Sequence, residues 1–207
     1  MKSDAPWALS VMWSLTSITL VFVILRLYTR VAIVKTFGAD DATYNNAFVL
    51  QLIFTVFTQL SANHGFGQSM SEIGDAEDVA RAVLLEVIGQ TFAAIGMAVA
   101  KWSLGLFLLR FVNINMIWHR TAIWTAMAGL MLTSISVAVI FWLQCNPPAY
   151  LRDRRIPRGF CHIDTIPVAF TLCIYCVVVD FFFAILPWIS LWNLTMNRRE
   201  KILIAGS

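Results

Sequence analysis

Three ionisable side chains lie inside apolar segments of the sequence and could carry chemistry: Glu86, Lys101 and Asp180. A charge at the centre of a bilayer costs at least ~2.5 kcal/mol on insertion scales, so such residues are commonly paired or functional. By helical rise, Lys101 and Asp180 lie within about 5 Å in depth. We predict that they form a buried pair or share a polar cavity, as either a static contact that fixes helix packing or a working site.

Glu86 is the third member of this candidate buried polar site. It lies fifteen positions before Lys101, which is about 22 Å along a helix axis, so it cannot reach that lysine. It either lines the mouth of a cavity or contacts lipid headgroups.

The four cysteines fall into two pairs with different expected roles. Cys145 and Cys161 flank a polar loop on the predicted outer face, where the environment is oxidising, and we predict a disulfide between them. Cys173 and Cys176 lie one turn apart inside an apolar helix and are expected to pack as small apolar side chains. No metal site is expected, because the histidines are in three separate segments: His64, His119 and His162.

Charged residues also gather near one predicted helix start. Asp40 and Asp41 begin an apolar segment and follow Arg26 and Arg30 in the chain. They either cap the helix and interact with its dipole, or form a cytoplasmic polar lock with one of the two arginines. The segment His64–Gly67 contains two glycines and predicts a tight turn at the membrane surface.

The elements that position these residues are predicted to be transmembrane helices. The chain is 59% hydrophobic and only 13% charged, with a mean hydropathy of +0.74, whereas soluble domains carry about 25% charged residues. This excludes a nucleic-acid-binding domain and indicates an all-α bundle in one transmembrane domain, residues 1–207. The predicted spans are 6–25, 42–62, 82–112, 121–145 and 165–192, and 202–207 is predicted to begin a sixth.

The basic residues predict an orientation. Lys2 precedes the first span, whereas Arg26, Arg30 and Lys35 follow it in a predicted loop. By the positive-inside rule the N-terminus lies outside. Asn193-Leu194-Thr195 matches a glycosylation acceptor but falls on the predicted cytoplasmic side, so we expect it to be unmodified.

Short motifs run in order along nearly the whole chain. They are Arg26 with Arg30, Phe37–Asp41, His64–Gly67, Lys101–Ser103 before Leu109–Arg110, Phe141–Trp142 with Cys145–Pro147, Gly159 with Cys161, Asp180 with Leu186–Pro187, and Lys201 with Gly206. In register they resemble the fungal rhodopsin-domain family of integral membrane proteins, which includes receptor-like proteins and membrane proteins encoded in secondary-metabolite clusters.

The resemblance implies a seven-helix bundle with an outside N-terminus, of which this chain holds five helices and the start of a sixth. A retinal-binding lysine would be expected on the seventh helix, whereas Lys101 is on the third, so we expect no cofactor. The family-motif positions are Arg26, Arg30, Gly38, Asp40, Asp41, His64, Gly65, Gly67, Ser103, Arg110 and Pro187.

The expected function is receptor-like sensing of an external cue, without catalysis. It implies an unknown ligand, contact with membrane lipid, a cytoplasmic signalling partner and a plasma-membrane location, or else an endomembrane one. One alternative is a membrane-embedded accessory of secondary metabolism, either an enzyme or a transporter. The other is a truncated, non-functional relative.

Overall fold

Five long α-helices make up most of the computed structural model, which describes residues 5–35, 37–65, 76–111, 117–151, 157 and 159–192. The helices are α1 (Ala5–Tyr28), α2 (Ala39–Asn63), α3 (Ala76–Phe111), α4 (Ile117–Leu143) and α5 (Thr165–Trp192). Shorter elements are a π-helix (Thr29–Ile33) after α1, a 3-10 helix (Pro148–Leu151), and the strands β1 (Cys145–Asn146) and β2 (Phe160–Cys161). The fold is an all-α membrane bundle, as predicted.

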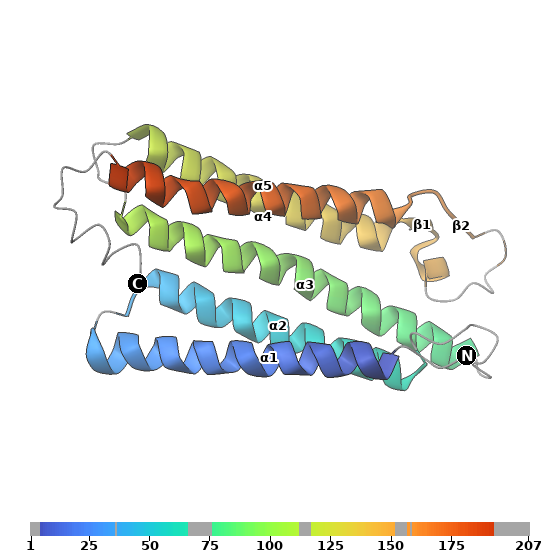
Figure 1. Ribbon diagram of the computed structural model, residues 1–207. Coiled ribbons are helices and arrows are strands. Elements are labelled where there is room, and N and C mark those ends of the chain that lie inside the picture. The colour runs from blue at the N-terminus through green and yellow to red at the C-terminus, as the bar shows by residue number, and fades with distance from the viewer. Residues whose placement is uncertain are drawn as a thin grey trace.

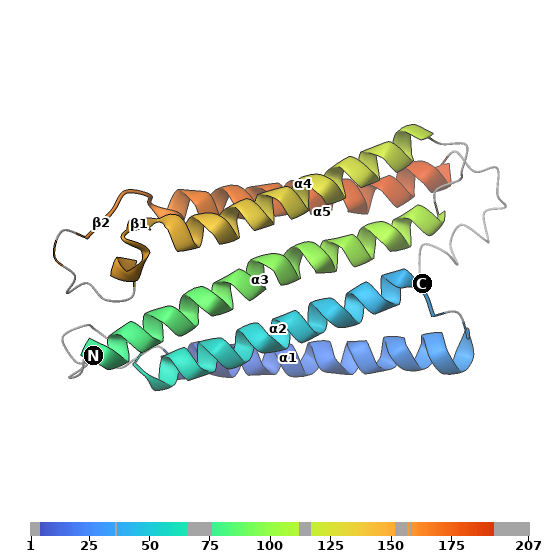
Figure 2. The ribbon, with the colours of Figure 1, turned by 180° about the vertical axis from the view of Figure 1, so that it is seen from behind.

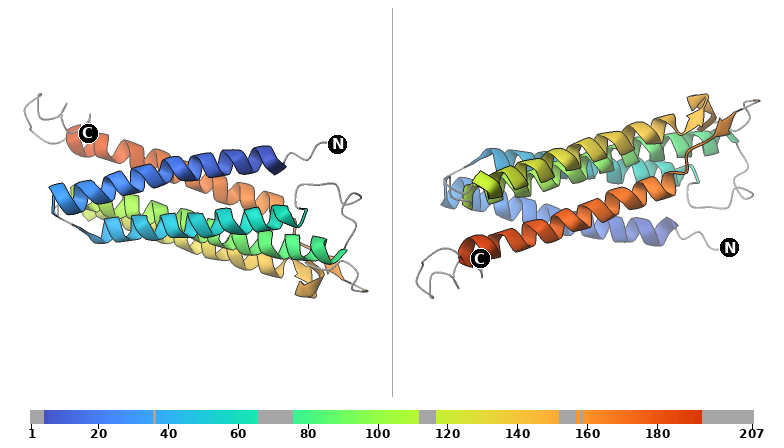
Figure 3. Two further views of the ribbon diagram at one scale, coloured as in Figure 1. Left: turned by 90° about the horizontal axis from the view of Figure 1, so that it is seen from below. Right: turned by 90° about the horizontal axis from the view of Figure 1, so that it is seen from above.

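The helices run up and down and lie side by side along one long axis (Figures 1 and 2). α3 runs between the α1–α2 pair and the α4–α5 pair. Viewed from above and below, α1 and α5 lie on one side of the bundle, and α4 lies on the other (Figure 3). We call the end that carries β1 and β2 the disulfide end, and the opposite end, where α1 and α3 finish and α2 begins, the arginine end.

Four of the described helical segments are long and apolar enough to cross a membrane: Pro6–Ile33, Glu77–Arg110, Ile117–Leu143 and Thr165–Trp188. α2 has 25 residues, which also suffices in length, but it is more polar. The outward faces of the spans carry large apolar side chains, such as Phe22, Phe170 and Trp188, each more than 60% exposed. Such surfaces suit contact with lipid rather than water.

The core lies between α3, α4 and α5. Ile123, Met127 and Leu130 of α4 are completely buried in it. Gly105 of α3 faces Met127, whose thioether would collide with any Cβ at that position. The indole N–H of Trp102 donates to the Met127 carbonyl over 2.9 Å. A small residue therefore lets α3 and α4 approach closely, as is common between membrane helices.

Several helix ends differ from the predicted spans. α1 and its π-helix continue through Arg26 and Arg30, which were predicted in a loop after Leu25; both arginines pair with carboxylates, so their charge does not stop the helix. α3 begins at Ala76 instead of position 82, because the acidic residues of its first turn favour a helix N-terminus. α4 begins at Ile117, earlier than predicted.

α4 ends at Leu143, before Cys145, which belongs to β1. β1 pairs antiparallel with β2, with Cys145 opposite Cys161. The predicted disulfide joins these two residues. Gly67 and residues 193–207, including the predicted start of a sixth helix, lie outside the described residues.

Candidate functional site

The middle of the bundle contains an ion pair between Lys101 of α3 and Asp180 of α5. The Lys101 side chain is 18% exposed, and the Asp180 side chain is 49% exposed. By helical rise, Lys101 lies roughly 15 Å from the arginine end of α3 and Asp180 roughly 18 Å from that end of α5. The pair therefore joins two helices within the depth of the spans.

A second contact repeats the pairing one turn nearer the disulfide end. The Cys176 thiol of α5 contacts the Met97 thioether of α3, with 3.0 Å between the sulfur atoms. Both partners precede the ion pair by four positions, so α3 and α5 keep one register over at least a turn. Cys176 is buried, as expected for a packing residue, whereas Cys173 is exposed.

Glu86 lies apart from the pair, on the disulfide-end half of α3. Its Oε1 accepts a hydrogen bond of 2.9 Å from the Gln90 side chain of the same helix. Its Oε2 is buried and finds no hydrogen-bond partner among the described residues. Glu86 and the ion pair therefore do not form one cavity.

The arginine end holds a second charged group, which we call the arginine cluster: Arg26, Arg30, Asp40, Asp41 and Arg110. The two carboxylates are buried, with side chains 2% and 4% exposed. The three arginine side chains are 21–45% exposed. The anions therefore lie inside and the cations outside.

Asp40 is shared by all three arginines. Its carboxylate lies 3.4 Å from Arg26, 3.8 Å from Arg30 and 3.2 Å from Arg110. Asp41 lies 3.0 Å from Arg26 and 3.6 Å from Arg30. The cluster joins α1, its π-helix, α2 and α3 at one point.

The backbone at the start of α2 positions the carboxylates. Asp41 accepts a hydrogen bond of 3.3 Å from the Gly38 N–H, which completes a cap. The Ser103 hydroxyl of α3 donates to the Asp40 carbonyl over 2.7 Å. A Cβ on Gly38 would collide with the Arg110 guanidinium, so a larger residue there would displace that side chain. Asp40 and Asp41 therefore both begin the helix and form ion pairs with Arg26 and Arg30.

Aromatic rings lie close to two of the guanidiniums. Arg26 lies 4.8 Å from the centre of the Tyr44 ring and 5.9 Å from that of Phe107. Arg30 lies 6.0 Å from the centre of the Phe107 ring. Such stacking stabilises arginine where water is partly excluded.

The disulfide end has its own polar contact between α2 and α3. His64 Nδ1 lies 3.1 Å from the Asp78 carboxylate, and Gly65 turns the chain with a φ of 95°. Nearby, the Ser61 hydroxyl donates to the Ala82 carbonyl over 2.7 Å. His64 and Gly65 thus serve the turn that the sequence predicts.

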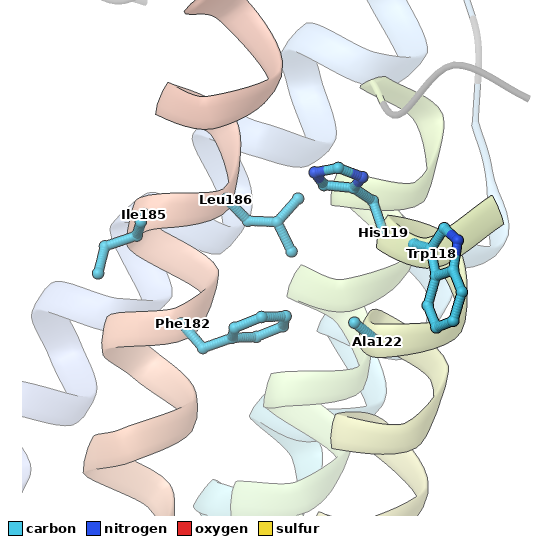
Figure 4. A pocket seen from close by; sticks show the side chains of 6 residues that line it. All are labelled: Trp118, His119, Ala122, Phe182, Ile185 and Leu186. Atoms are coloured by element: carbon cyan, nitrogen blue, oxygen red, sulfur yellow. The ribbon is translucent and has the colours of Figure 1, made fainter. Parts of the chain in front are cut away.

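An apolar hollow of about 250 Å³ opens between α4 and α5 towards the arginine end (Figure 4). It is lined by Trp118, His119, Ala122, Phe182, Ile185 and Leu186. Pro187, a motif position, follows Leu186 inside α5. No group of three His, Cys, Asp or Glu side chains among the described residues is placed to hold a metal ion.

The model of the fungal rhodopsin domain matches residues 25–207. The chain belongs to this family. The match begins at Leu25, one residue before Arg26. It therefore includes the arginine cluster, the Lys101–Asp180 pair and the disulfide of this fungal rhodopsin domain. No curated protein and no solved structure matches the chain.

Sequence reasoning found the charged residues of both sites but missed several partners. It did not pair Arg110 with Asp40, and it did not foresee the contacts of Ser103, Tyr44, Phe107 or Met97. The one available signal was the presence of Ser103 and Arg110 on one helix at a spacing of seven, which places them on one face.

Proposed function

We propose that this fungal rhodopsin domain acts as a receptor-like membrane protein that senses an external cue without catalysis. The observation that carries the proposal is the Lys101–Asp180 pair between α3 and α5. A paired charge inside a span is stable only while its partner stays close. A ligand that separates or replaces either partner would therefore change the relative position of the two helices.

The arginine cluster supports the same proposal from the other end of α3. Ser103 and Arg110 of α3 both bind Asp40 of α2. α3 thus carries the central pair and part of the cluster on one rigid element, so a shift of α3 at Lys101 would act on the cluster. Coupling between two sites requires such a shared element, whose position both sites can affect.

In this proposal the N-terminus and the disulfide end face outside, and the arginine end faces a cytoplasmic signalling partner at the plasma membrane. An enzyme would require acid and base groups that converge on one cavity. Glu86, the remaining candidate, bonds within its own helix and is separated from the pair. No observation favours the enzymatic alternative over the receptor.

The test compares Lys101→Met, Asp180→Leu and the double variant of the full chain in detergent. The yield of folded protein and the hydrogen exchange of residues 104–111 are measured in each. For a state-dependent pair, we expect all three to fold and the variants to change exchange near the cluster. Loss of yield in both single variants with recovery in the double variant would make the pair structural, and unchanged exchange in all three would refute the coupling.

A further inference from the structure

The arginine cluster has an unbalanced charge. Its three guanidiniums surround two carboxylates, all within 4 Å of an opposite charge. The group therefore carries one net positive charge. Because the carboxylates are buried and the guanidiniums are partly exposed, this excess faces outward.

Arg30 carries the excess. Its two contacts with carboxylates measure 3.6 and 3.8 Å, which is beyond hydrogen-bond distance. Arg30 donates no side-chain hydrogen bond to any residue within the described ranges, whereas Arg26 donates to both aspartates. Nε and Nη2 of Arg30 face the two carboxylates. A guanidinium has five N–H donors in a planar fork that fits a phosphate or carboxylate, so the Nη1 side of Arg30 is available to an acceptor from outside the chain.

The surroundings of Arg30 indicate where that acceptor comes from. The first and third spans end close by, at Ile33 and Arg110, which places the cluster at the boundary of the hydrocarbon region. Large apolar side chains next to Arg30 point outward: Leu27, Val31, Ile33, Val34 and Phe37 are 40–65% exposed. A cationic group beside an apolar exterior fits a molecule with an anionic head and acyl chains.

We propose that Arg30, supported by Arg26 and Arg110, binds the phosphate of an anionic membrane lipid at the arginine end. The headgroup phosphate accepts hydrogen bonds from the free side of the Arg30 guanidinium, and the acyl chains lie along the exposed side chains of the π-helix. The bound phosphate neutralises the charge that Asp40 and Asp41 leave unbalanced. This site shares the arginine cluster with the proposed sensing function but does not involve Lys101 or Asp180, so lipid binding can be tested separately from the variants of that pair.

The same observations argue against a soluble anion. A free phosphate would gain the guanidinium contacts but not those with the apolar side chains beside them. Charge-assisted bidentate pairs are strong, and the adjacent acyl chains add burial of apolar surface. A lipid phosphate is therefore expected to bind more tightly than inorganic phosphate.

The experiment titrates phosphatidic acid into the full chain in phosphatidylcholine nanodiscs and counts bound lipid by native mass spectrometry. Arg30→Gln is compared with Lys35→Gln, which removes a charge from an exposed residue in the same segment with no ion pair within the described chain. Loss of a charge-assisted hydrogen-bonded pair predicts about tenfold weaker binding for Arg30→Gln and little change for Lys35→Gln. Arg30→Lys keeps the charge but not the fork, and should bind with intermediate strength.

Several outcomes would overturn the proposal. Equal losses in Arg30→Gln and Lys35→Gln, or no preference of the unaltered chain for phosphatidic acid, would reduce the effect to general surface charge. Displacement of the lipid by inorganic phosphate at equal concentration would indicate a site for a soluble anion. If Arg30→Gln does not fold, Arg30→Lys against Lys35→Gln decides the question, and equal binding by these two refutes the site.

Discussion

At the scale of single residues, Asp40 is the most connected charge in the described chain. Three arginines, from α1, its π-helix and α3, contact its buried carboxylate, and Ser103 binds its carbonyl. A buried carboxylate is tolerated only when it is paired, and removing one partner leaves the others uncompensated. The stability of the arginine end should therefore depend strongly on this residue.

Asp40→Asn is expected to destabilise the bundle by about 3 kcal/mol, because three guanidiniums lose a shared anion. The midpoint of thermal unfolding in detergent measures the effect. Asp78→Asn is the matched control, since Asp78 is half exposed and its ion pair among the described residues is with His64; its expected cost is below about 1 kcal/mol. Equal midpoints for the two variants would contradict the central role of Asp40.

Gly38→Ala tests the close approach of α2 and α3. The added methyl group would collide with the Arg110 guanidinium and the Asp40 carboxylate, and overpacking of this kind costs about 1–3 kcal/mol. In an Arg110→Ala background the cost should be smaller, because part of the obstacle is removed. A double-mutant cycle of unfolding midpoints measures the difference, and an unchanged cost would refute the contact.

At the scale of elements, the charged contacts lie where helices must keep a register. α3 meets α5 through Met97 and Lys101 and meets α2 through Ser103 and Arg110. In lipid, apolar faces give little preference for one rotation or translation of a helix. The polar contacts supply that preference, which explains why most motif positions are charged, small or polar.

A disulfide between Cys145 and Cys161 joins the two strands of the β1–β2 hairpin. Its disulfide closes a loop with a sequence separation of 16 residues, which stabilises by about 3 kcal/mol in the chain-entropy model. The double variant Cys145→Ser with Cys161→Ser should lower the unfolding midpoint accordingly, and reductant should not lower it further. Cys173→Ser, at an exposed free thiol, keeps the disulfide and is the control, so its midpoints with and without reductant should match those of the unaltered chain.

At the scale of the whole molecule, the two ends of the bundle differ in chemistry. The disulfide end carries the hairpin with its disulfide, and the arginine end carries the arginine cluster with one net positive charge. Disulfides persist in oxidising compartments, and basic residues accumulate on the cytoplasmic side. Both rules favour the proposed orientation with the N-terminus outside.

The orientation can be tested by an epitope placed before Met1 in a fungal host. We expect antibody to reach it on intact cells, because the first span is followed by more basic residues than precede it. The acceptor Asn193-Leu194-Thr195 should carry no glycan, so an endoglycosidase should not change the mobility of the chain. Labelling only after permeabilisation, or a glycan at Asn193, would reverse the topology.

The sequence by itself determined the membrane class, the order of the helices and the charged residues that require partners. It could do so because apolar length and buried charge are local properties with large energetic consequences. The disulfide between Cys145 and Cys161 could be predicted as well, because the two residues flank one polar loop on the face predicted to be oxidising.

Only the tertiary structure decided how the charges are shared. The chain order cannot show that Arg110 reaches Asp40 or that Ser103 binds the backbone of α2. These contacts depend on the rotation and depth of α3 against α2 and α5, which side-chain packing across helices sets. α1 and its π-helix continued past the predicted end at Leu25 for a related reason, because carboxylates on α2 keep Arg26 and Arg30 within the helix.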